Sequence, residues 1–223
     1  MRSIESLDNI KNKNIILRLD LNVPIVNGKI TDTNRIDKII PTLNFLIKQK
    51  AKVIIISHVG RPSGKIVKEL SLEPVSLCIK SKIKKEVSLL KENIFNLKKE
   101  DIFKNSIDGL VLLENIRFYP EEEANDDKFS EKLASFGEIY VNDAFSCSHR
   151  DHASVSKITK YITSYSGIQI NEEVNALKKI TSEIKKPITC IIGGSKISSK
   201  INIIKNLIPR FDNIIIVLSL IHI

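Results

Sequence analysis

Cysteine is scarce in this sequence. The three cysteines, Cys78, Cys147 and Cys190, lie far apart and form no C-x-x-C pair. An odd number of widely spaced cysteines argues against a disulfide framework and against a zinc knuckle. We therefore expect reduced thiols.

Long apolar runs are also lacking. None approaches the roughly 18 residues that a membrane-spanning helix requires. The start, MRSIESLDNIKNKN, has no apolar stretch followed by a small-residue cleavage site. These absences predict a cytoplasmic protein. With 42% hydrophobic and 27% charged residues over 223 positions, the composition is that of an ordinary globular protein of one or two domains.

Aromatic residues make up only 5% of the chain, although its net charge is +9. A basic chain invites a nucleic-acid interpretation, but few aromatic side chains are available for base stacking. Much of the excess charge is lysine in amphipathic segments such as Lys80–Asp101, for which a solvated helix face is the simpler explanation. Nucleic-acid binding remains the least favoured alternative, and we expect neither a nucleic-acid nor a membrane partner.

What the sequence does contain is a regular alternation of short apolar runs and helical patterns. This alternation is typical of βα units and a mainly parallel sheet, which places the chain in the α/β class. The runs that predict strands are Asn14–Leu19, Val53–Ile56, Leu110–Leu113, Ile139–Val141, Ile188–Ile192 and Ile214–Leu218.

Helical spacing separates several of these runs. A helix is expected over Arg35–Lys50, in which Pro41 should cause a kink or a restart. Another helix, Asn171–Ile184, ends before Pro187 and is a candidate connector between two lobes.

A shorter helix is expected before the fourth predicted strand. It places Phe129, Leu133 and Phe136 on one face, and Gly137 can end it.

Unusual residues gather where the predicted strands end. In an open parallel sheet the loops after the strands lie along one edge, where such folds bind ligands, so motifs distant in sequence can meet there. The motifs are RLDLNVP (Arg18–Pro24), SHVGRPSGK (Ser57–Lys65), LLENIRF (Leu112–Phe118), YVNDAFSCSHRDHAS (Tyr140–Ser154) and IIGGSK (Ile191–Lys196).

These motifs and the start of the first long helix are rich in cations. A guanidinium offers a planar fork that pairs with phosphate or carboxylate, so several forks at one edge predict a small, highly charged anion as ligand. Asp20 and Asn22 add groups that can hold the hydroxyls of a sugar acid. Each residue alone could be a surface charge or a turn former, but independent surface charges have no reason to follow every strand. The cations are Arg35, His58, Arg61, Arg117, His149 and Arg150.

The spacing of Cys147, His149 and His152 contains possible metal ligands. No partner cluster supplies the rest of a tetrahedral zinc site, so we assign no metal ligand. A nucleophilic Cys147 paired with His58 or His149 is a further alternative, although no helix start is present to lower the thiol pKa.

The segment IIGGSKISSK (Ile191–Lys200) follows a predicted strand and precedes a helical pattern. Its glycines let the backbone approach a ligand, and the free amides of a helix start favour an anion. Lys196 and Lys200 lie one turn apart, so both can reach the same polyphosphate. A tight turn followed by an ordinary basic helix is the alternative.

Together these segments resemble the amino-terminal part of the phosphoglycerate kinase family. The resemblance implies Rossmann-like, three-layer α/β/α lobes joined by a helix. It divides the chain into an acid-binding lobe (1–170), a connecting helix (171–186) and the beginning of a nucleotide lobe (187–223). The matching segments, in the family's order over residues 14–210, are RLDLNVP, TNRID leading to PTLNFL, SHVGRPSG, LLENIRF, VNDAF followed by HRDHAS, and GGSKISSK.

The same resemblance implies a function, which is reversible phosphoryl transfer in glycolysis. The substrates would be 1,3-bisphosphoglycerate with ADP, and 3-phosphoglycerate with ATP, the nucleotide as its magnesium complex. Arg35 and Lys196 would stabilise the phosphoryl group in transfer, and the protein would act as a monomer. The acid would be bound by Asp20, Asn22, Arg35, His58, Arg61, Arg117, His149 and Arg150, with His152 beside them. The nucleotide phosphates would be bound by Gly194, Ser195, Lys196 and Lys200.

The sequence departs from the family's pattern in two places. SCSHRDH replaces the small Gly-x-Ala context usual before the His-Arg pair, and Asp151 puts a negative charge beside Arg150 that should weaken anion binding modestly. The chain also stops at Ile223, before the adenine pocket and the magnesium ligand of the family's nucleotide lobe. We therefore expect a truncated chain that is inactive alone, and the alternative is a non-catalytic anion-binding fragment from a truncated or frameshifted gene.

Overall fold

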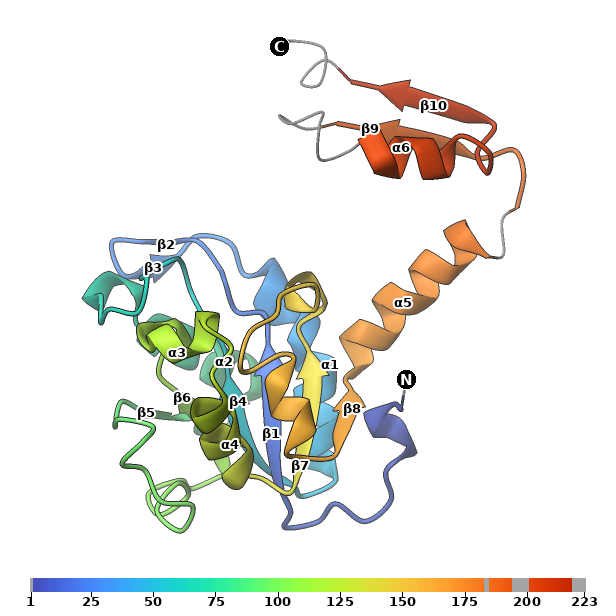
Figure 1. The fold of residues 1–223 in the computed structure, drawn as a ribbon. Helices are drawn as coiled ribbons and strands as arrows, with labels where there is room; N and C mark the ends of the chain where they lie inside the picture. Colours follow the sequence, from blue (N-terminus) through green and yellow to red (C-terminus); the bar gives the residue numbers. More distant parts are fainter. Residues whose placement is uncertain (1, 183–184, 194–200, 218–223) are drawn as a thin grey trace. The chain divides into compact units, whose positions relative to one another are not determined.

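The computed structural model describes residues 2–182, 185–193 and 201–217 (Figure 1). Contacts within the chain divide it into two compact units, one up to Glu172 and one from Glu173 onward. Over the described ranges, no helix is both long enough and apolar enough to cross a bilayer.

The first unit is built on a six-stranded parallel sheet with the order β5-β6-β4-β1-β7-β8. The chain extends the sheet from β1 in one direction and later returns to place β7 on the other side of β1. Such a reversal of strand order is where open α/β sheets bind ligands. The strands are β1 (Asn14–Leu19), β4 (Lys52–Ile56), β5 (Ser88–Leu90), β6 (Leu110–Leu113), β7 (Ile139–Asp143) and β8 (Ser164–Ser166).

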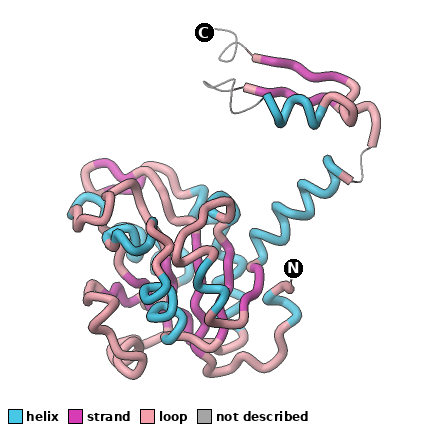
Figure 2. The backbone as a smooth tube through the Cα atoms, viewed as in Figure 1, coloured by secondary structure: helices cyan, strands magenta, loops and turns pink. Residues whose placement is uncertain are grey.

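Helices cover both faces of this sheet and make it the middle of three layers (Figures 1 and 2). Alternate side chains of β1 enter different cores, because successive residues of a strand face opposite ways. Leu17 packs with α1 and α2, whereas Ile16 packs with α4. Burial of both faces explains the continuous apolar runs in the sequence. The helices are α1 (Asn34–Lys48), α2 (Glu73–Ile83), α3 (Pro120–Glu123) and α4 (Asp127–Ser135).

Short elements complete the first unit. A small antiparallel hairpin follows β1, and single 3₁₀ turns lie in the loops. The hairpin is β2 (Ile25–Val26) and β3 (Lys29–Ile30), and the turns are η1 (Ile4–Ser6), η2 (Lys68–Leu70), η3 (Ile116–Phe118), η4 (Phe145–Cys147) and η5 (Lys157–Lys160).

The predicted α/β class is confirmed, and every predicted strand of the first unit is present, whereas β5, β8 and the hairpin were not predicted.

The helix restart that was one of the two expectations at Pro41 is wrong, because α1 continues through this residue. Pro41 is exposed, while Ile39 and Leu43 on either side of it are fully buried. Packing of the apolar face therefore outweighs the hydrogen bond that proline cannot donate.

The expectation of a solvated helix within Lys80–Asp101 is also wrong over most of its length. Helix α2 ends at Ile83, and the next residue, Lys84, has the left-handed backbone angle φ of 54°. The chain then forms β5, which pairs with β6. Hydrogen bonding to a sheet edge here overrides the amphipathic pattern.

The second unit contains two parallel strands and a helix. They are β9 (Thr189–Ile192), β10 (Asn213–Ile216) and α6 (Ile201–Leu207). Both strands fall within the predicted runs or one residue from them, although Leu218, the predicted end of the last run, lies outside the described residues.

Helix α5 (Ile168–Thr181) contains the division between the units, and it begins before the predicted start at Asn171. The predicted end, Ile184, lies outside the described residues.

The first turn of α5 is bonded to the sheet. Asp143 at the end of β7 accepts hydrogen bonds from Ile170 N (3.1 Å) and Thr42 Oγ1 (2.5 Å). Gly167 is pressed against this carboxylate, since a Cβ atom there would lie 2.2 Å from Asp143 Cγ. These bonds fix the first turn of α5 on the sheet of the first unit.

Candidate functional site

A cavity of about 250 Å³ lies at the carboxyl end of the central strands. Its described lining carries four arginines against one carboxylate, Asp20, and we name it the arginine cavity. That balance favours an anionic ligand. The lining residues are Asp20, Asn22, Arg35, His58, Gly60, Arg61, Arg117, Ser146, Cys147 and Arg150.

Loops after several strands build the arginine cavity. Asp20 and Asn22 follow β1, and His58 follows β4. Arg117 lies in η3 after β6, and Ser146 lies in η4 after β7. The first turn of α1 adds Arg35. The sequence expectation that these loops converge is therefore correct in geometry.

Asp20 organises one wall of the cavity. Its Oδ2 accepts hydrogen bonds from Arg35 and from the Ser146 hydroxyl. Its Oδ1 accepts Asn22 N at 3.1 Å, which is the turn bond expected of an Asp followed by a polar residue. The turn-forming role and the cavity-facing role are thus both present in one carboxylate.

Arg117 lines the cavity and is only 4% exposed. Its Nη1 donates to Gly60 O (2.9 Å), and its Nε lies 3.3 Å from Glu123 Oε1, an ion pair whose angle falls short of a hydrogen bond. Burial lowers the Arg117 pKa, and Glu123 opposes that shift. A buried guanidinium with an imperfectly bonded nitrogen is well placed to gain from an anionic ligand.

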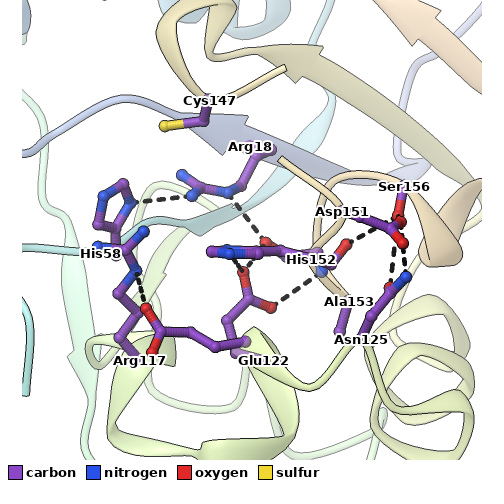
Figure 3. A network of polar contacts seen from close by, with 12 residues as sticks. Arg18, His58, Arg117, Glu122, Asn125, Cys147, Asp151, His152, Ala153 and Ser156 are labelled. Atoms are coloured by element: carbon purple, nitrogen blue, oxygen red, sulfur yellow. Dashed lines mark hydrogen bonds and ion pairs between the residues drawn. The ribbon is translucent and has the colours of Figure 1, made fainter. Parts of the chain in front are cut away.

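His58 is neutral rather than one of the cations, which corrects the sequence interpretation. Burial, followed by the nearby Arg18, lowers its pKa to about 2. Arg18 Nη2 lies 2.9 Å from His58 Nδ1 (Figure 3). A guanidinium can only donate, so Nδ1 must accept and the ring proton lies on Nε2. His58 therefore offers a neutral N–H donor.

A buried polar network continues beneath His58 (Figure 3). Arg18 Nε donates to Ser154 Oγ (3.0 Å), and Ser154 Oγ donates to Glu122 Oε1 (2.7 Å). His152 Nδ1 lies 3.7 Å from the same Glu122 oxygen. Burial raises the Glu122 pKa, with Arg18 acting in the opposite direction.

Seven of the eight predicted acid-binding residues line the arginine cavity, and His149 does not. His149 is exposed, whereas His152 faces Glu122.

The expectation that Asp151 weakens anion binding at Arg150 is not supported by the contacts of Asp151. Its carboxylate accepts Asn125 Nδ2 (2.6 Å) and the Ser156 hydroxyl. The predicted nucleotide residues Gly194, Ser195, Lys196 and Lys200 lie outside the described residues.

The geometry bears on two further alternatives, a metal site and a nucleophilic Cys147. In residues 2–182, 185–193 and 201–217, no three or more His, Cys, Asp or Glu side chains gather as metal ligands. Cys147 is buried and His149 is exposed, whereas Cys147 and His58 both line the arginine cavity. Of the two pairings, the one with His58 therefore stays an alternative. The Cys147 sulfur lies 3.6 Å from Ser146 Oγ.

Sequence reasoning missed Arg18, Ser146 and Glu122. Arg18 gave a signal, because it is a charge inside an otherwise apolar strand run, and such a residue needs buried partners. Ser146 belongs to the segment SCSHRDH, where the sequence departs from the family's pattern. Its hydroxyl donates a hydrogen bond to Asp20. Glu122 gave none, because it lies in an acidic run, Glu121–Glu123, that suggests a solvated surface.

A second, larger cavity of about 600 Å³ lies beyond the ends of β5 and β6, and we name it the apolar cavity. It shares a wall with the arginine cavity, since neighbouring residues of η3 divide between them, Arg117 in one and Phe118 in the other. Gly64 N donates to Arg117 O (3.2 Å) within this wall. Its lining includes Ile66, Lys68, Phe95, Phe118, Tyr119 and Glu121.

Comparisons with solved structures agree with this geometry. The structure of phosphoglycerate kinase from Coxiella burnetii has a TM-score of 0.84 and 36% identity, over 96% of this chain and 54% of that one. The crystal structure of phosphoglycerate kinase from Pyrococcus horikoshii OT3 has a TM-score of 0.85 and 27% identity, over 97% and 55%.

Sequence comparisons give the same answer. Phosphoglycerate kinase of Wolbachia pipientis subsp. Culex pipiens (strain wPip) is 47% identical over 216 residues, which are 96% of this chain and 54% of the relative. Phosphoglycerate kinase of Dictyoglomus turgidum is 41% identical over 209 residues. The chain thus spans about half the length of the curated relatives that it matches. The sequence model of the family described as Phosphoglycerate kinase matches residues 4–220, and the chain therefore belongs to the phosphoglycerate kinase family.

Proposed function

We propose that this chain supplies the acid-binding part of a phosphoglycerate kinase. Its reaction would be reversible phosphoryl transfer between 1,3-bisphosphoglycerate with ADP and 3-phosphoglycerate with ATP. The observation that carries the proposal is the arginine cavity, a small space with four guanidinium groups and one carboxylate in its described lining. Family membership and the position of the cavity at the reversal of strand order support it.

The proposed roles follow from charge and direction. Arg35, Arg61, Arg117 and Arg150 pair with the phosphate and carboxylate of the acid, because guanidinium forks match both groups. His58 donates from Nε2, and Asn22 lies beside it in the lining. Asn22 Oδ1 is already held by Gly60 N (2.9 Å), so its amide N–H groups remain to meet a hydroxyl or carboxylate oxygen.

Arg35 has a second proposed role, which is to stabilise the phosphoryl group in transfer together with Lys196. Phosphoryl transfer asks the protein mainly for positioning, for cations around the migrating group and for exclusion of water. The Arg35 side chain is 48% exposed and is held by Asp20, so it can exchange this carboxylate for a ligand at little cost in desolvation. Lys196 enters the proposal from the family resemblance alone.

The proposed division of labour places the acid on residues 1–170, a connecting helix at 171–186, and nucleotide phosphates on Gly194, Ser195, Lys196 and Lys200. Magnesium bound to the nucleotide would neutralise phosphate charge. The one carboxylate in the described lining of the arginine cavity, Asp20, is already held by Arg35 and Ser146. The described residues therefore fit the anionic acid and give no magnesium ligand set.

Calorimetric titration of residues 1–223 with 3-phosphoglycerate tests the proposal. We expect one-to-one binding that weakens as salt rises, since part of the cavity is solvent-exposed. Glycerate, which lacks the phosphate, should bind at least about tenfold more weakly, because it leaves charged hydrogen bonds unmade. Absence of binding to 3-phosphoglycerate, together with tight, salt-sensitive binding of RNA, would sink the proposal. Binding is the informative measurement here because the relatives named as kinases are about twice as long.

A further inference from the structure

Glu122 is a buried carboxylate that the proposed chemistry does not use. It lies in α3, is 0% exposed and is not part of the lining of the arginine cavity. Figure 3 shows the polar contacts around it. Both carboxylate oxygens accept from one residue, since Ser154 N donates to Oε2 (2.9 Å) and Ser154 Oγ donates to Oε1 (2.7 Å). Burying a carboxylate completely costs free energy, because the charge loses its hydration. The two bonds from Ser154 offset part of this cost, and the question is what role keeps a carboxylate at this position.

Ser154 is held firmly enough to transmit the position of Glu122. Its carbonyl oxygen accepts the hydroxyl of Tyr140 (2.7 Å), and its own N–H and O–H are both committed to Glu122. With the hydroxyl proton directed to Glu122, the lone pairs of Ser154 Oγ are left for Arg18 Nε at 3.0 Å. The direction of this serine hydroxyl is therefore set by Glu122.

Arg18 in turn needs that arrangement. Its guanidinium is 1% exposed, and its three bonds go to acceptors without charge, namely Ser154 Oγ, Leu19 O and His58 Nδ1. A buried cation without a nearby opposite charge is unstable. Glu122 lies one hydroxyl away and supplies that charge.

We propose that Glu122 is a positioning residue of the arginine cavity, which holds Arg18 through Ser154 and thereby fixes His58 as a neutral Nε2–H donor. The effect on acid binding rests on the function proposed above, whereas the effect on His58 does not. Glu122 is not part of the cavity lining, and the hydrogen-bonded route from it to His58 runs through Ser154 and Arg18.

The other charged groups around His58 cannot do what the hydrogen-bonded series from Glu122 to His58 does, which is to select the tautomer of the ring. Those that face it are Arg117 from η3 and Arg150 and His152 from the segment after η4, and all of them disfavour a proton on the ring. They act on the charge of the imidazole. The choice between Nδ1–H and Nε2–H in the neutral ring is made by the group bonded to Nδ1, which is Arg18.

The test is the tautomer of His58 in Glu122→Gln, measured by ¹⁵N and ¹³C NMR of the imidazole rings. The two bonds from Ser154 reach different carboxylate oxygens, and in glutamine an NH2 donor replaces one of these acceptors. The carboxylate then no longer holds the serine hydroxyl in its present direction. We expect the Nε2–H form alone in the unaltered protein and a substantial Nδ1–H population in the variant. The four histidines of the chain make assignment by single His→Gln variants practical.

Matched variants separate positioning from general damage. Ser154→Ala removes the linking hydroxyl but leaves the carboxylate and the backbone N–H bond, so it should give the same Nδ1–H population. Glu121→Gln changes the neighbouring residue, which lines the apolar cavity, and should leave His58 unchanged. If Glu122→Gln does not fold, Ser154→Ala decides the question alone.

Acid binding gives an independent second readout. Glu122→Gln and Ser154→Ala should each weaken 3-phosphoglycerate binding about tenfold, the effect of one misdirected hydrogen-bond donor. Folded variants that retain only the Nε2–H tautomer would overturn the proposal, whatever their affinity. If the unaltered protein does not bind 3-phosphoglycerate, the proposed function fails, but the NMR result still decides the role of Glu122.

Discussion

The arginine cavity and the apolar cavity lie at the same edge of the same sheet, yet their linings differ in net charge and in apolar character. The smaller one, of about 250 Å³, gathers four guanidinium groups against one carboxylate. The larger one, of about 600 Å³, has six apolar or aromatic side chains in its lining, and its two lysines are matched by two glutamates. Two consecutive residues, Arg117 and Phe118, separate them. The fold thus provides hollows at this edge, but the residues that follow each strand decide which hollow can bind a charged ligand. Size alone would have pointed to the other one.

The largest effect should come from removing the cation at the shared wall. Arg117→Ala should weaken 3-phosphoglycerate binding by about 100-fold or more, because it withdraws a buried, hydrogen-bonded charge. The matched variant is Lys68→Ala, which removes a cation from the lining of the apolar cavity and should leave the affinity unchanged. Calorimetry measures both.

Arg61→Ala is the variant to use if Arg117→Ala does not fold. Arg61 lines the same cavity but is exposed, so its removal should not disturb the core. It should cost about tenfold in affinity, as expected for a lost hydrogen bond to a charged group. Equal losses from Lys68→Ala and Arg61→Ala would mean that the two cavities do not differ as ligand sites.

The next effect concerns the other side of the wall. Phe118→Ala should lower the free energy of unfolding by about 3 kcal/mol, since Phe118 is 8% exposed and its removal leaves a void. Acid affinity should not change, because this side chain faces the apolar cavity. Urea unfolding and calorimetry on the same sample separate the two quantities. A loss of affinity without a loss of stability would contradict the division of the wall.

A third difference lies in pH, because His58 lines the arginine cavity and no histidine lines the described part of the apolar one. The folded protein keeps His58 neutral down to a pKa of about 2, whereas the unfolded chain takes up the proton near the ordinary value of 6.5. The unfolded state therefore binds more protons below pH 6.5. The corresponding stability is fully present above pH 6.5 and is lost as pH falls below it, by about 2 kcal/mol at pH 5.

The variant that tests this is His58→Gln, which should flatten the slope of stability against pH between 6.5 and 5. Urea unfolding at several pH values measures the slope, and His149→Gln, at an exposed position, is the control. His152 adds a smaller slope of the same sign, because burial also lowers its pKa, and this part should persist in His58→Gln. An unaltered slope in His58→Gln would show that the imidazole is protonated in the folded state.

The smallest effect is expected at the rim of the arginine cavity. Asp151→Asn should change acid affinity less than about twofold, because this carboxylate bonds Asn125 and Ser156 and its effect on Arg150 is screened by solvent. Calorimetry checks this as well. A gain of tenfold would show that Asp151 does compete with the ligand for Arg150.

The sequence predicted the fold class and most of the arginine cavity for one physical reason. Carboxyl ends of parallel strands share an edge, so Asp20, His58, Arg117 and Arg150 could be brought together without any side-chain geometry. The same reasoning did not place His149, which is absent from the described lining of the arginine cavity. It is next to Arg150 in sequence, but the chain turns after η4 and leaves it exposed.

The charge state of His58 and the role of Glu122 could not be predicted, because both depend on burial. The residue type alone places His58 among the cations, and its burial together with the contact to a buried Arg18 shows that it is neutral. Strand β5 was missed for a related reason. Its side chains are only half-buried and lack an apolar run, so the pairing with β6 is what defines it.

The bonds between Asp143 and the start of α5 have a practical consequence for expression of the first unit alone. Asp143 is the last residue of β7, and its carboxylate is satisfied by Thr42 and by Ile170 from the next element along the chain. A polypeptide cut before Ile170 would leave this buried acid without one of its donors, at the strand that leads to Ser146 and Arg150. The shortest fragment that keeps the arginine cavity intact therefore carries the whole first turn of α5. Position 167, just before this helix, must stay glycine, because a Cβ atom there would clash with the Asp143 carboxylate.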